Sequence, residues 1–141
     1  MRKGCVFLDS KGYFRSDDKF AALRVARAVS ETMEECGVKN CRNLRERPVI
    51  VMCIGTDRST GDSLGPLVGD MLVKWKMSGI HVFGTLDNPV HARNLKETLQ
   101  SALQIHPGAY LVAVDASLGV LDHVGCISVG QGPIKPGAGL K

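Results

Sequence analysis

Aromatic residues are scarce in this chain: its 141 residues include four phenylalanines, two tyrosines and one tryptophan, so any core must be built from aliphatic side chains. No apolar run approaches the ~20 residues that a membrane-spanning helix needs. The charged N-terminus, with Arg2, Lys3 and Asp9, leaves no room for the apolar region of a signal peptide. We therefore expect a cytoplasmic protein that has no membrane partner.

Several site-defining motifs are also missing. None of the five cysteines falls in a C-x-x-C motif, and Cys36 and Cys41 form a weak zinc-like spacing that has no second pair. The glycine-rich loop ends in Gly61-Asp62, where a phosphate-binding loop has Gly-Lys. No nucleophile elbow of the form G-x-S-x-G occurs. These absences argue against a disulfide framework, a zinc site, nucleotide binding and a serine hydrolase.

The positive charge is confined to the first third of the chain. Residues 1–47 hold 11 Lys/Arg and 7 Asp/Glu, residues 48–141 hold 7 of each, and the net charge is +4. The basic stretch before the first strong strand contains no aromatic residue that could stack on a base; its members are Lys39, Arg42, Arg45 and Arg47. We therefore expect a solvated linker there and no nucleic-acid partner.

Apolar periodicity and turn residues predict seven elements. They are a helix over 17–36, a strand over 48–54, a helix from Asp62 or Ser63 to Gly79, a strand over 80–83, a helix opening at Asn88-Pro89 and ending before His106, a strand over 110–114 and a strand over 123–129. The order strand, helix, strand, helix, strand is typical of an α/β fold with a mostly parallel sheet. We expect residues 1–47 to form a helical extension and connector, and residues 48–141 to form the α/β domain.

Each predicted helix has an apolar face that we expect to be buried. In the first helix this face is Ala22, Val25, Ala26, Val29, Met33 and Cys36. In the second helix it is Leu64, Leu67, Val68, Met71, Leu72 and Trp75. In the third helix it is Ala92, Leu95, Leu99, Ala102 and Leu103. Asp17 or Asp18 is expected to cap the first helix, and Gly37 to end it.

Aspartates follow the first three predicted strands of the α/β region. Asp57 and Asp62 come after the first strand, Asp87 after the second and Asp115 after the third. The carboxyl ends of parallel strands meet at one edge of a sheet, where ligands of such folds collect. The sequence therefore predicts a group of carboxylates at this edge, with His91 close to it.

Two carboxylates at such an edge can do two kinds of chemistry. They can share a proton, one acting as a base towards water and the other as an acid towards a leaving group. They can also bind a divalent metal that activates the water. Structural roles stay open as well: Asp62 as a helix cap, Asp115 as a strand-end turn, Asp57 and Asp87 as turn formers, and His91 as a surface residue of a first helical turn.

Four long segments resemble one known family. They are Val51–Leu67 (VMCIGTDRSTGDSLGPL), Phe83–Ala92 (FGTLDNPVHA), Ala113–Gly119 (AVDASLG) and Ile127–Gly139 (ISVGQGPIKPGAG). The chain resembles the YyaC-type family of sporulation proteins. That family is similar to the germination protease, which degrades small acid-soluble spore proteins, and more distantly to hydrogenase maturation proteases. The resemblance implies a three-layer α/β/α sandwich with a mostly parallel sheet.

The same resemblance implies roles for two acids. Asp62, in Asp-Ser-Leu-Gly-Pro, and Asp115, in Val-Ala-Val-Asp-Ala, match the two functional acids of both protease families. In the germination protease these are the proposed catalytic aspartates, whereas in hydrogenase maturation proteases they bind a metal with a later histidine. This chain has Lys135 in its closing loop and no histidine after His123. That difference favours a two-aspartate site without a cofactor, with a divalent metal as the alternative.

The implied function is that of a peptidase acting on a protein or peptide, with small acid-soluble spore proteins as candidate substrates in the forespore or spore interior. The residues expected to shape the substrate groove are Gly55, Thr56, Asp57, Ser59, Thr60, Asp87, His91, Gly132 and Lys135. A non-catalytic or metal-binding sporulation protein that keeps the fold is the alternative, and a homo-oligomer is compatible with either. The family continues past the Gly-Ala-Gly-Leu segment, so we expect this chain to be C-terminally incomplete.

Overall fold

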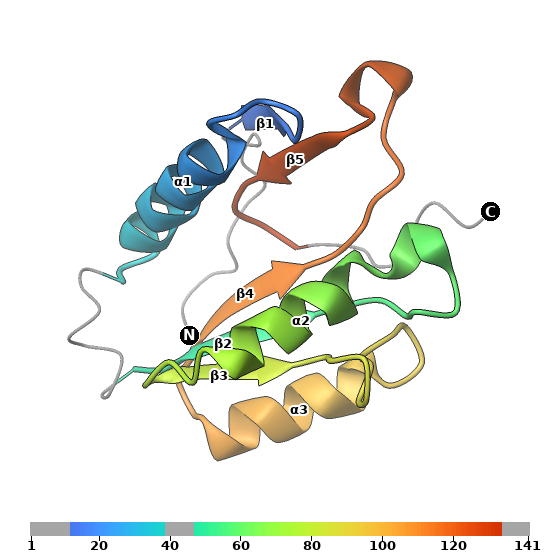
Figure 1. Cartoon of the computed structure of the whole chain (residues 1–141). Helices are drawn as coiled ribbons and strands as arrows, with labels where there is room; N and C mark the ends of the chain where they lie inside the picture. Colours follow the sequence, from blue (N-terminus) through green and yellow to red (C-terminus); the bar gives the residue numbers. More distant parts are fainter. Residues whose placement is uncertain (1–11, 39–46, 134–141) are drawn as a thin grey trace. The chain divides into compact units, whose positions relative to one another are not determined.

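A computed structural model describes residues 12–38 and 47–133 of the chain (Figure 1). The described residues fall into two compact units, one of residues 12–38 and 119–133 and the other of residues 47–118. Residues 119–133 thus belong with the N-terminal segment, a grouping that the sequence did not indicate. None of the described helices has the length and apolarity needed to span a membrane.

The first unit is a strand pair with one helix. Its elements are β1 (Gly12–Arg15), α1 (Ala21–Glu35), a 3-10 turn (Leu121–His123) and β5 (Cys126–Val129). β1 and β5 pair antiparallel, from Gly12 opposite Val129 to Arg15 opposite Cys126, and α1 packs against both strands. The predicted strand over 123–129 is confirmed in its second half. β1 was missed because a four-residue strand is too short to show a clear alternation.

Helix α1 begins four residues later than predicted. The chain first makes a turn, in which Asp18 Oδ1 accepts a hydrogen bond from the Phe20 N–H at 2.9 Å, so Asp18 holds the turn rather than capping the helix. The fully buried residues are Ala21, Ala28 and Thr32, so the predicted face is rotated; Ala22, Ala26 and Cys36 are exposed. The predicted stop is confirmed, since Gly37 has φ +93°.

The second unit contains a parallel three-stranded sheet. Its strands are β2 (Val49–Cys53), β3 (Ile80–Phe83) and β4 (Tyr110–Val114), in the order β3-β2-β4. All five residues of β2 are buried, as a strand covered on both faces requires. The prediction of a mixed α/β fold with a parallel sheet is confirmed.

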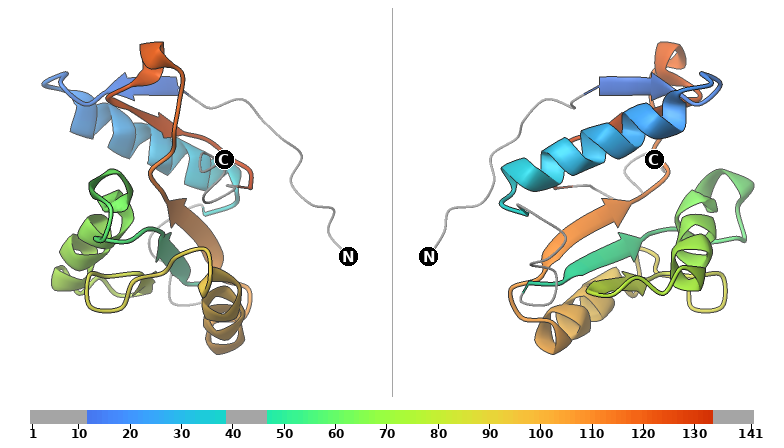
Figure 2. Two further views of the ribbon diagram at one scale, coloured as in Figure 1. Left: turned by 90° about the vertical axis from the view of Figure 1, so that its right-hand side faces the viewer. Right: turned by 60° about the vertical axis from the view of Figure 1, so that its left-hand side comes forward.

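Helices α2 (Leu64–Lys74) and α3 (Leu95–Ile105) lie on opposite faces of this sheet (Figure 2). Side chains of β2 alternate between the faces. Ile50 and Met52 pack with Ala102 of α3 in the main apolar cluster, which Leu95 and Leu99 extend. Cys53 points the other way, towards Gly69 of α2.

The apolar stripe predicted to bury α2 is mostly exposed. Leu64, Leu67, Met71 and Trp75 face outwards, with Met71 57% and Trp75 64% exposed, whereas Val68 and Leu72 are half-buried. The buried residues are Gly65, Pro66 and Gly69. A methyl group on Gly65 would overlap the backbone of Ile54, and one on Gly69 would overlap the carbonyl oxygen of Gly84. The helix therefore meets the sheet backbone to backbone, and no large side chain fits in the contact.

The boundaries of α2 and α3 also differ from the prediction. α2 ends at Lys74, not at Gly79, because the chain turns at Lys76, where φ is +46°. α3 starts after Asn94, not at Asn88-Pro89, because Val90 still forms a parallel bridge with Ile54 and keeps the chain extended to that point. On α3, Ala92 lies before the helix, Leu103 is exposed, and Leu95, Leu99 and Ala102 face the core as expected.

Arg47 is more than part of a solvated linker. Its guanidinium lies 3.8 Å from the centroid of the Tyr110 ring. It donates hydrogen bonds to the carbonyl oxygen of Gly108 at 2.6 Å and to the Tyr110 hydroxyl at 2.8 Å. These contacts tie the entry of β2 to the entry of β4. Lys39, Arg42 and Arg45 lie outside the described residues.

Candidate functional site

Asp62 is held over the carboxyl end of β2 by backbone contacts. The chain turns at Gly55, where φ is +142° and a methyl group would overlap the carbonyl oxygen of Asp62, so a side chain at this position is excluded. The N–H of Thr56 donates to the same carbonyl at 3.0 Å. The glycine-rich loop thus folds back on the end of β2 and fixes where Asp62 lies.

The carboxylate of Asp62 does not cap α2. Asp62 closes a 3-10 turn (Thr60–Asp62), in which its N–H donates to the carbonyl of Ser59 at 2.9 Å. The N-cap of α2 is Ser63, whose hydroxyl donates to the carbonyl of Thr60 at 2.9 Å, and the helix has no side-chain cap hydrogen bond. The capping role considered for Asp62 is therefore wrong, because its carboxylate makes no cap hydrogen bond to the start of α2.

Asp115 directly follows β4 and is half-buried. Its pKa is raised above the ordinary value for aspartate, first by burial and then by the negative charge of Asp62; a hydrogen bond with the backbone of Ala116 opposes the shift. Like charges raise a carboxyl pKa when they face each other at short range. The pKa of Asp115 thus responds to the charge of Asp62, which lies 53 positions earlier in the sequence.

Most of the other predicted site residues in this loop are more exposed than Asp62 and Asp115. Asp57, Ser59 and Thr60 are exposed, and Thr56 is half-buried, with its hydroxyl accepting a hydrogen bond from the Arg58 N–H at 3.3 Å. This hydroxyl orders the turn that precedes Asp62. Their expected part in shaping a substrate groove stays a prediction.

A pocket of about 620 Å³ lies between the segment after β3 and the start of α3. Asp87 and His91, both predicted site residues, line it together with Val82, Phe83, Gly84, Thr85, Asn88, Pro89, Val90, Asn94 and Thr98. His91 sits in the loop before α3, not in its first turn. The carbonyl of Val90 accepts a hydrogen bond from the Gly55 N–H at 2.8 Å. The pocket therefore adjoins the glycine turn that positions Asp62.

Three side chains that the sequence did not single out hold this loop. Asp70 Oδ1 accepts from the Leu86 N–H at 3.0 Å, and Thr85 Oγ1 accepts from the Asn88 N–H at 3.1 Å. Asn94 Oδ1 accepts from the His91 N–H at 2.8 Å, while its Nδ2 donates to the carbonyl of Pro89 at 3.0 Å. Asn94 immediately before an apolar helical stripe was a usable cap signal, but Asn88-Pro89 matched the same rule earlier in the chain.

The remaining predicted residues belong to segments of the chain other than the loops that hold Asp62, Asp87 and His91. Gly132 belongs to the first unit, is exposed, and has open space around its α-carbon. Lys135 lies outside the described residues. Cys53 is a core residue as expected, and burial raises the pKa of its thiol to about 11. Within residues 12–38 and 47–133, no three His, Cys, Asp or Glu side chains are grouped so as to hold a metal ion.

Comparison with known proteins places the chain in a family. Residues 15–141 match the family described as "Protein of unknown function (DUF1256)". The chain is 41% identical over 143 residues to the "Uncharacterized protein YyaC" of Bacillus subtilis (strain 168), covering 99% of this chain and 66% of that protein. No solved structure matches the chain significantly. The chain therefore belongs to the DUF1256 family, and it spans about two thirds of the length of the curated relative that it matches.

Proposed function

We propose that this protein is a peptidase in which Asp62 and Asp115 activate a water molecule against a peptide bond. The observation that supports the proposal most directly is that Asp62 and Asp115 follow two neighbouring parallel strands, β2 and β4, at the same edge of the sheet, where the charge of Asp62 acts on Asp115. Burial and the negative charge of Asp62 raise the pKa of Asp115. Such a pair supplies both an acid and a base at one pH.

In the proposed reaction the two acids have different roles. The Asp62 carboxylate accepts a proton from water as the water oxygen attacks the peptide carbonyl carbon. Asp115, whose raised pKa keeps it protonated to higher pH, donates its proton to the amide nitrogen as the C–N bond breaks. Atoms balance: one water is consumed, and a carboxyl and an amine are released. The proton on Asp62 then passes back to Asp115 through water, which restores the starting state of the pair, and no cofactor is needed for these steps.

The finer features of the proposal come from the family likeness. They are a three-layer α/β/α sandwich similar to that of the germination and hydrogenase maturation proteases, small acid-soluble spore proteins as substrates, and a place in the cytoplasm of the forespore or spore. The opposed positions of α2 and α3 on the sheet support the layered fold.

The proposal is tested by digestion of a proteome-derived peptide library, with new termini identified by mass spectrometry. The wild-type chain is expected to produce cleavages that both Asp62→Asn and Asp115→Asn abolish, while circular dichroism shows that each variant stays folded. Asp122→Asn is the matched control, because it changes an exposed carboxylate of the other unit that is not part of the proposed site. Undiminished turnover in Asp62→Asn or Asp115→Asn, or a wild-type chain without any cleavage, contradicts the proposal.

The stability of the Asp115→Asn variant provides a second test of the role of Asp115. Because the folded-state pKa of Asp115 is raised, ionising it costs folding free energy. This cost is absent at pH values below the ordinary pKa of aspartate and appears as the pH rises through the folded-state pKa. We expect Asp115→Asn to raise the free energy of unfolding at pH 7 by ~0.2–1 kcal/mol, the size of a partly exposed charge effect, and to lose this advantage in acid. A purely structural turn role for Asp115 predicts a loss of stability instead.

A further inference from the structure

β3 is an outer strand of the parallel sheet, and its backbone polarity can be assigned. Val49 donates its N–H to the carbonyl of Gly79, on the β3 side, whereas Ile54 donates to Val114, on the β4 side. Backbone N–H and C=O groups change sides with each residue of a strand. The residues of β3 that face β2 are therefore His81 and Phe83, and the N–H and C=O of Val82 point away from the sheet.

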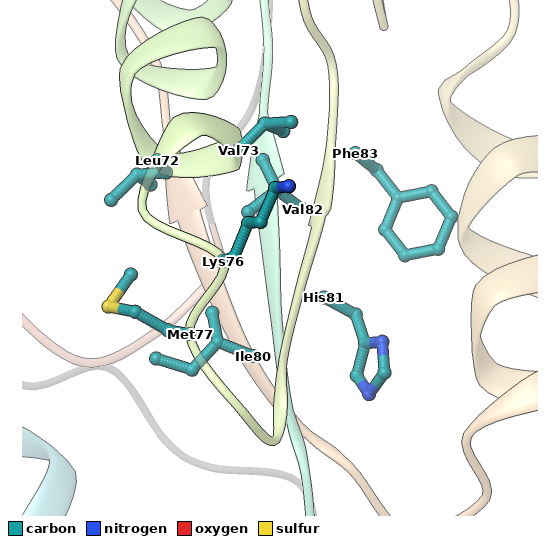
Figure 3. Close-up of a pocket in the computed structure, with 8 residues that line it drawn as sticks. All are labelled: Leu72, Val73, Lys76, Met77, Ile80, His81, Val82 and Phe83. Atoms are coloured by element: carbon teal, nitrogen blue, oxygen red, sulfur yellow. The ribbon is translucent and has the colours of Figure 1, made fainter.

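Two pockets flank this outer edge. The smaller one, of about 280 Å³, is lined by Leu72, Val73, Lys76, Met77, Ile80, His81, Val82 and Phe83 (Figure 3). The larger one is the pocket of about 620 Å³ described above. Val82 and Phe83 line both pockets, so the two pockets adjoin β3, and the larger one extends to the loop before α3.

The two sides of β3 differ in the chemistry of the residues that line the pockets. Figure 3 shows Ile80 and Val82 on the side of α2, and His81 and Phe83 on the side of α3. On the α2 side the lining is aliphatic, apart from Lys76. On the α3 side it is rich in hydrogen-bonding groups and includes the exposed carboxylate of Asp87. A strand laid against Val82 would present alternate side chains to an apolar surface and to a polar, acidic one.

The edge lacks three of the usual protections against an added strand. Exposed edges normally carry proline, charged side chains or a bulge. The sequence of β3 is Ile-His-Val-Phe, and its register with β2 runs without interruption from Ile80 to Phe83. Within the described part of the chain, β3 pairs with β2 alone. A sheet edge without proline, charge or a bulge, flanked by two pockets, is the arrangement used for binding an extended peptide by strand addition.

We propose that β3 is the docking edge for the substrate polypeptide. The substrate binds as an added strand on Val82, with apolar residues towards α2 and polar or basic residues towards Asp87. This inference rests on the proposed peptidase function, whose two aspartates lie at the carboxyl end of the same sheet. It goes beyond that function because it assigns the substrate's conformation and side-chain pattern.

The test measures binding separately from cleavage. The probe is a fluorescent eight-residue peptide that alternates valine with lysine or asparagine, and its affinity for the Asp62→Asn chain is measured by fluorescence anisotropy. In this background Val82→Pro removes the outward N–H without removing a hydrogen bond to β2, which is where proline is tolerated in a sheet. Val82→Thr keeps the N–H and is the matched control. A second probe carries N-methyl groups on alternate amides and cannot pair.

We expect the Asp62→Asn and Val82→Thr proteins to bind the first probe, and Val82→Pro to weaken binding at least tenfold while circular dichroism and the unfolding midpoint show an intact fold. The N-methylated probe is expected not to bind. Equal binding of both probes, no binding to the parent protein, or unchanged binding to a folded Val82→Pro protein overturns the proposal. Sedimentation that shows a dimer dissolved by Val82→Pro would instead assign the edge to a second copy of the chain.

The outcomes also separate this inference from the proposed function. If the peptide library is not cleaved but the edge binds the probe as described, peptide docking stands and hydrolysis fails. If the library is cleaved and Val82→Pro leaves KM unchanged, hydrolysis stands and docking at β3 fails.

Discussion

The two helices that cover the sheet make contact with it in opposite ways. α3 packs through side chains: Leu95, Leu99 and Ala102 fill the space over Ile50 and Met52. α2 packs through its backbone, with Gly65 and Gly69 against the main chain of Ile54 and Gly84. A side-chain contact can adjust by changing rotamers, whereas a backbone contact cannot. The position of α2 relative to the sheet is therefore more rigidly fixed than that of α3. Asp62 lies just before α2 in the sequence.

The close packing of α2 also determines where Asp62 lies in the candidate site. Close packing of α2 sets the height of the glycine loop above β2, and Gly55 completes the arrangement by contacting Asp62 itself. A catalytic pair must hold its geometry to within a fraction of an ångström. The same packing leaves the large apolar side chains of α2 exposed. The exposed apolar surface is therefore larger on α2 than on α3.

The largest effect is expected for Gly69→Ala. Alanine favours a helix over glycine by ~1 kcal/mol, so propensity alone predicts stabilisation. The new methyl group would overlap the Gly84 carbonyl, and we expect a loss of more than ~3 kcal/mol or failure to fold, as for overpacking of a rigid contact. Chemical denaturation checks this. Gly61→Ala is the control, because its methyl group meets no atom within 4 Å and should change stability by less than ~0.5 kcal/mol.

A smaller effect is expected on the α3 side. Leu99→Ala removes a side chain packed on the apolar cluster and should lower the free energy of unfolding by ~2–3 kcal/mol, the lower range for such truncations because Leu99 is only half-buried. The folded fraction should keep its cleavage activity, since α3 packs on the sheet face opposite to α2, the helix that follows Asp62. Leu103→Ala on the exposed side is the comparison and should cost less than ~1 kcal/mol. Equal losses in both variants would contradict the assigned packing face.

The smallest effect is expected for the outward stripe of α2. Replacing Leu67 or Met71 by glutamine should change stability by no more than ~0.5 kcal/mol, because both side chains are about half exposed or more and glutamine is a good helix former. Thermal unfolding of each variant measures this. A loss comparable to that of Leu99→Ala would show that the stripe is covered in solution, and would remove the contrast between the two helices.

Much of the fold could be predicted from local pattern. The apolar run at 49–53, the turn glycines and the alternation of strands with helices predict a parallel sheet whose strand ends carry Asp62, Asp87 and Asp115. The buried face of α2 could not be predicted this way. Periodicity assumes that large apolar side chains mark the contact, and here glycine marks it. The start of α3 was misjudged for a related reason, since a long-range bridge between Ile54 and Val90 overrides a good local cap.

By itself, the sequence determined which acids follow which strands and that those strands run side by side in parallel, because hydrophobic period and turn chemistry are local properties of the chain. Tertiary structure alone decided that the charge of Asp62 acts on Asp115, that α2 approaches on its glycines and that β3 is an outer strand among the described residues. These outcomes depend on distances between segments that are remote in sequence, and close packing of backbones sets those distances.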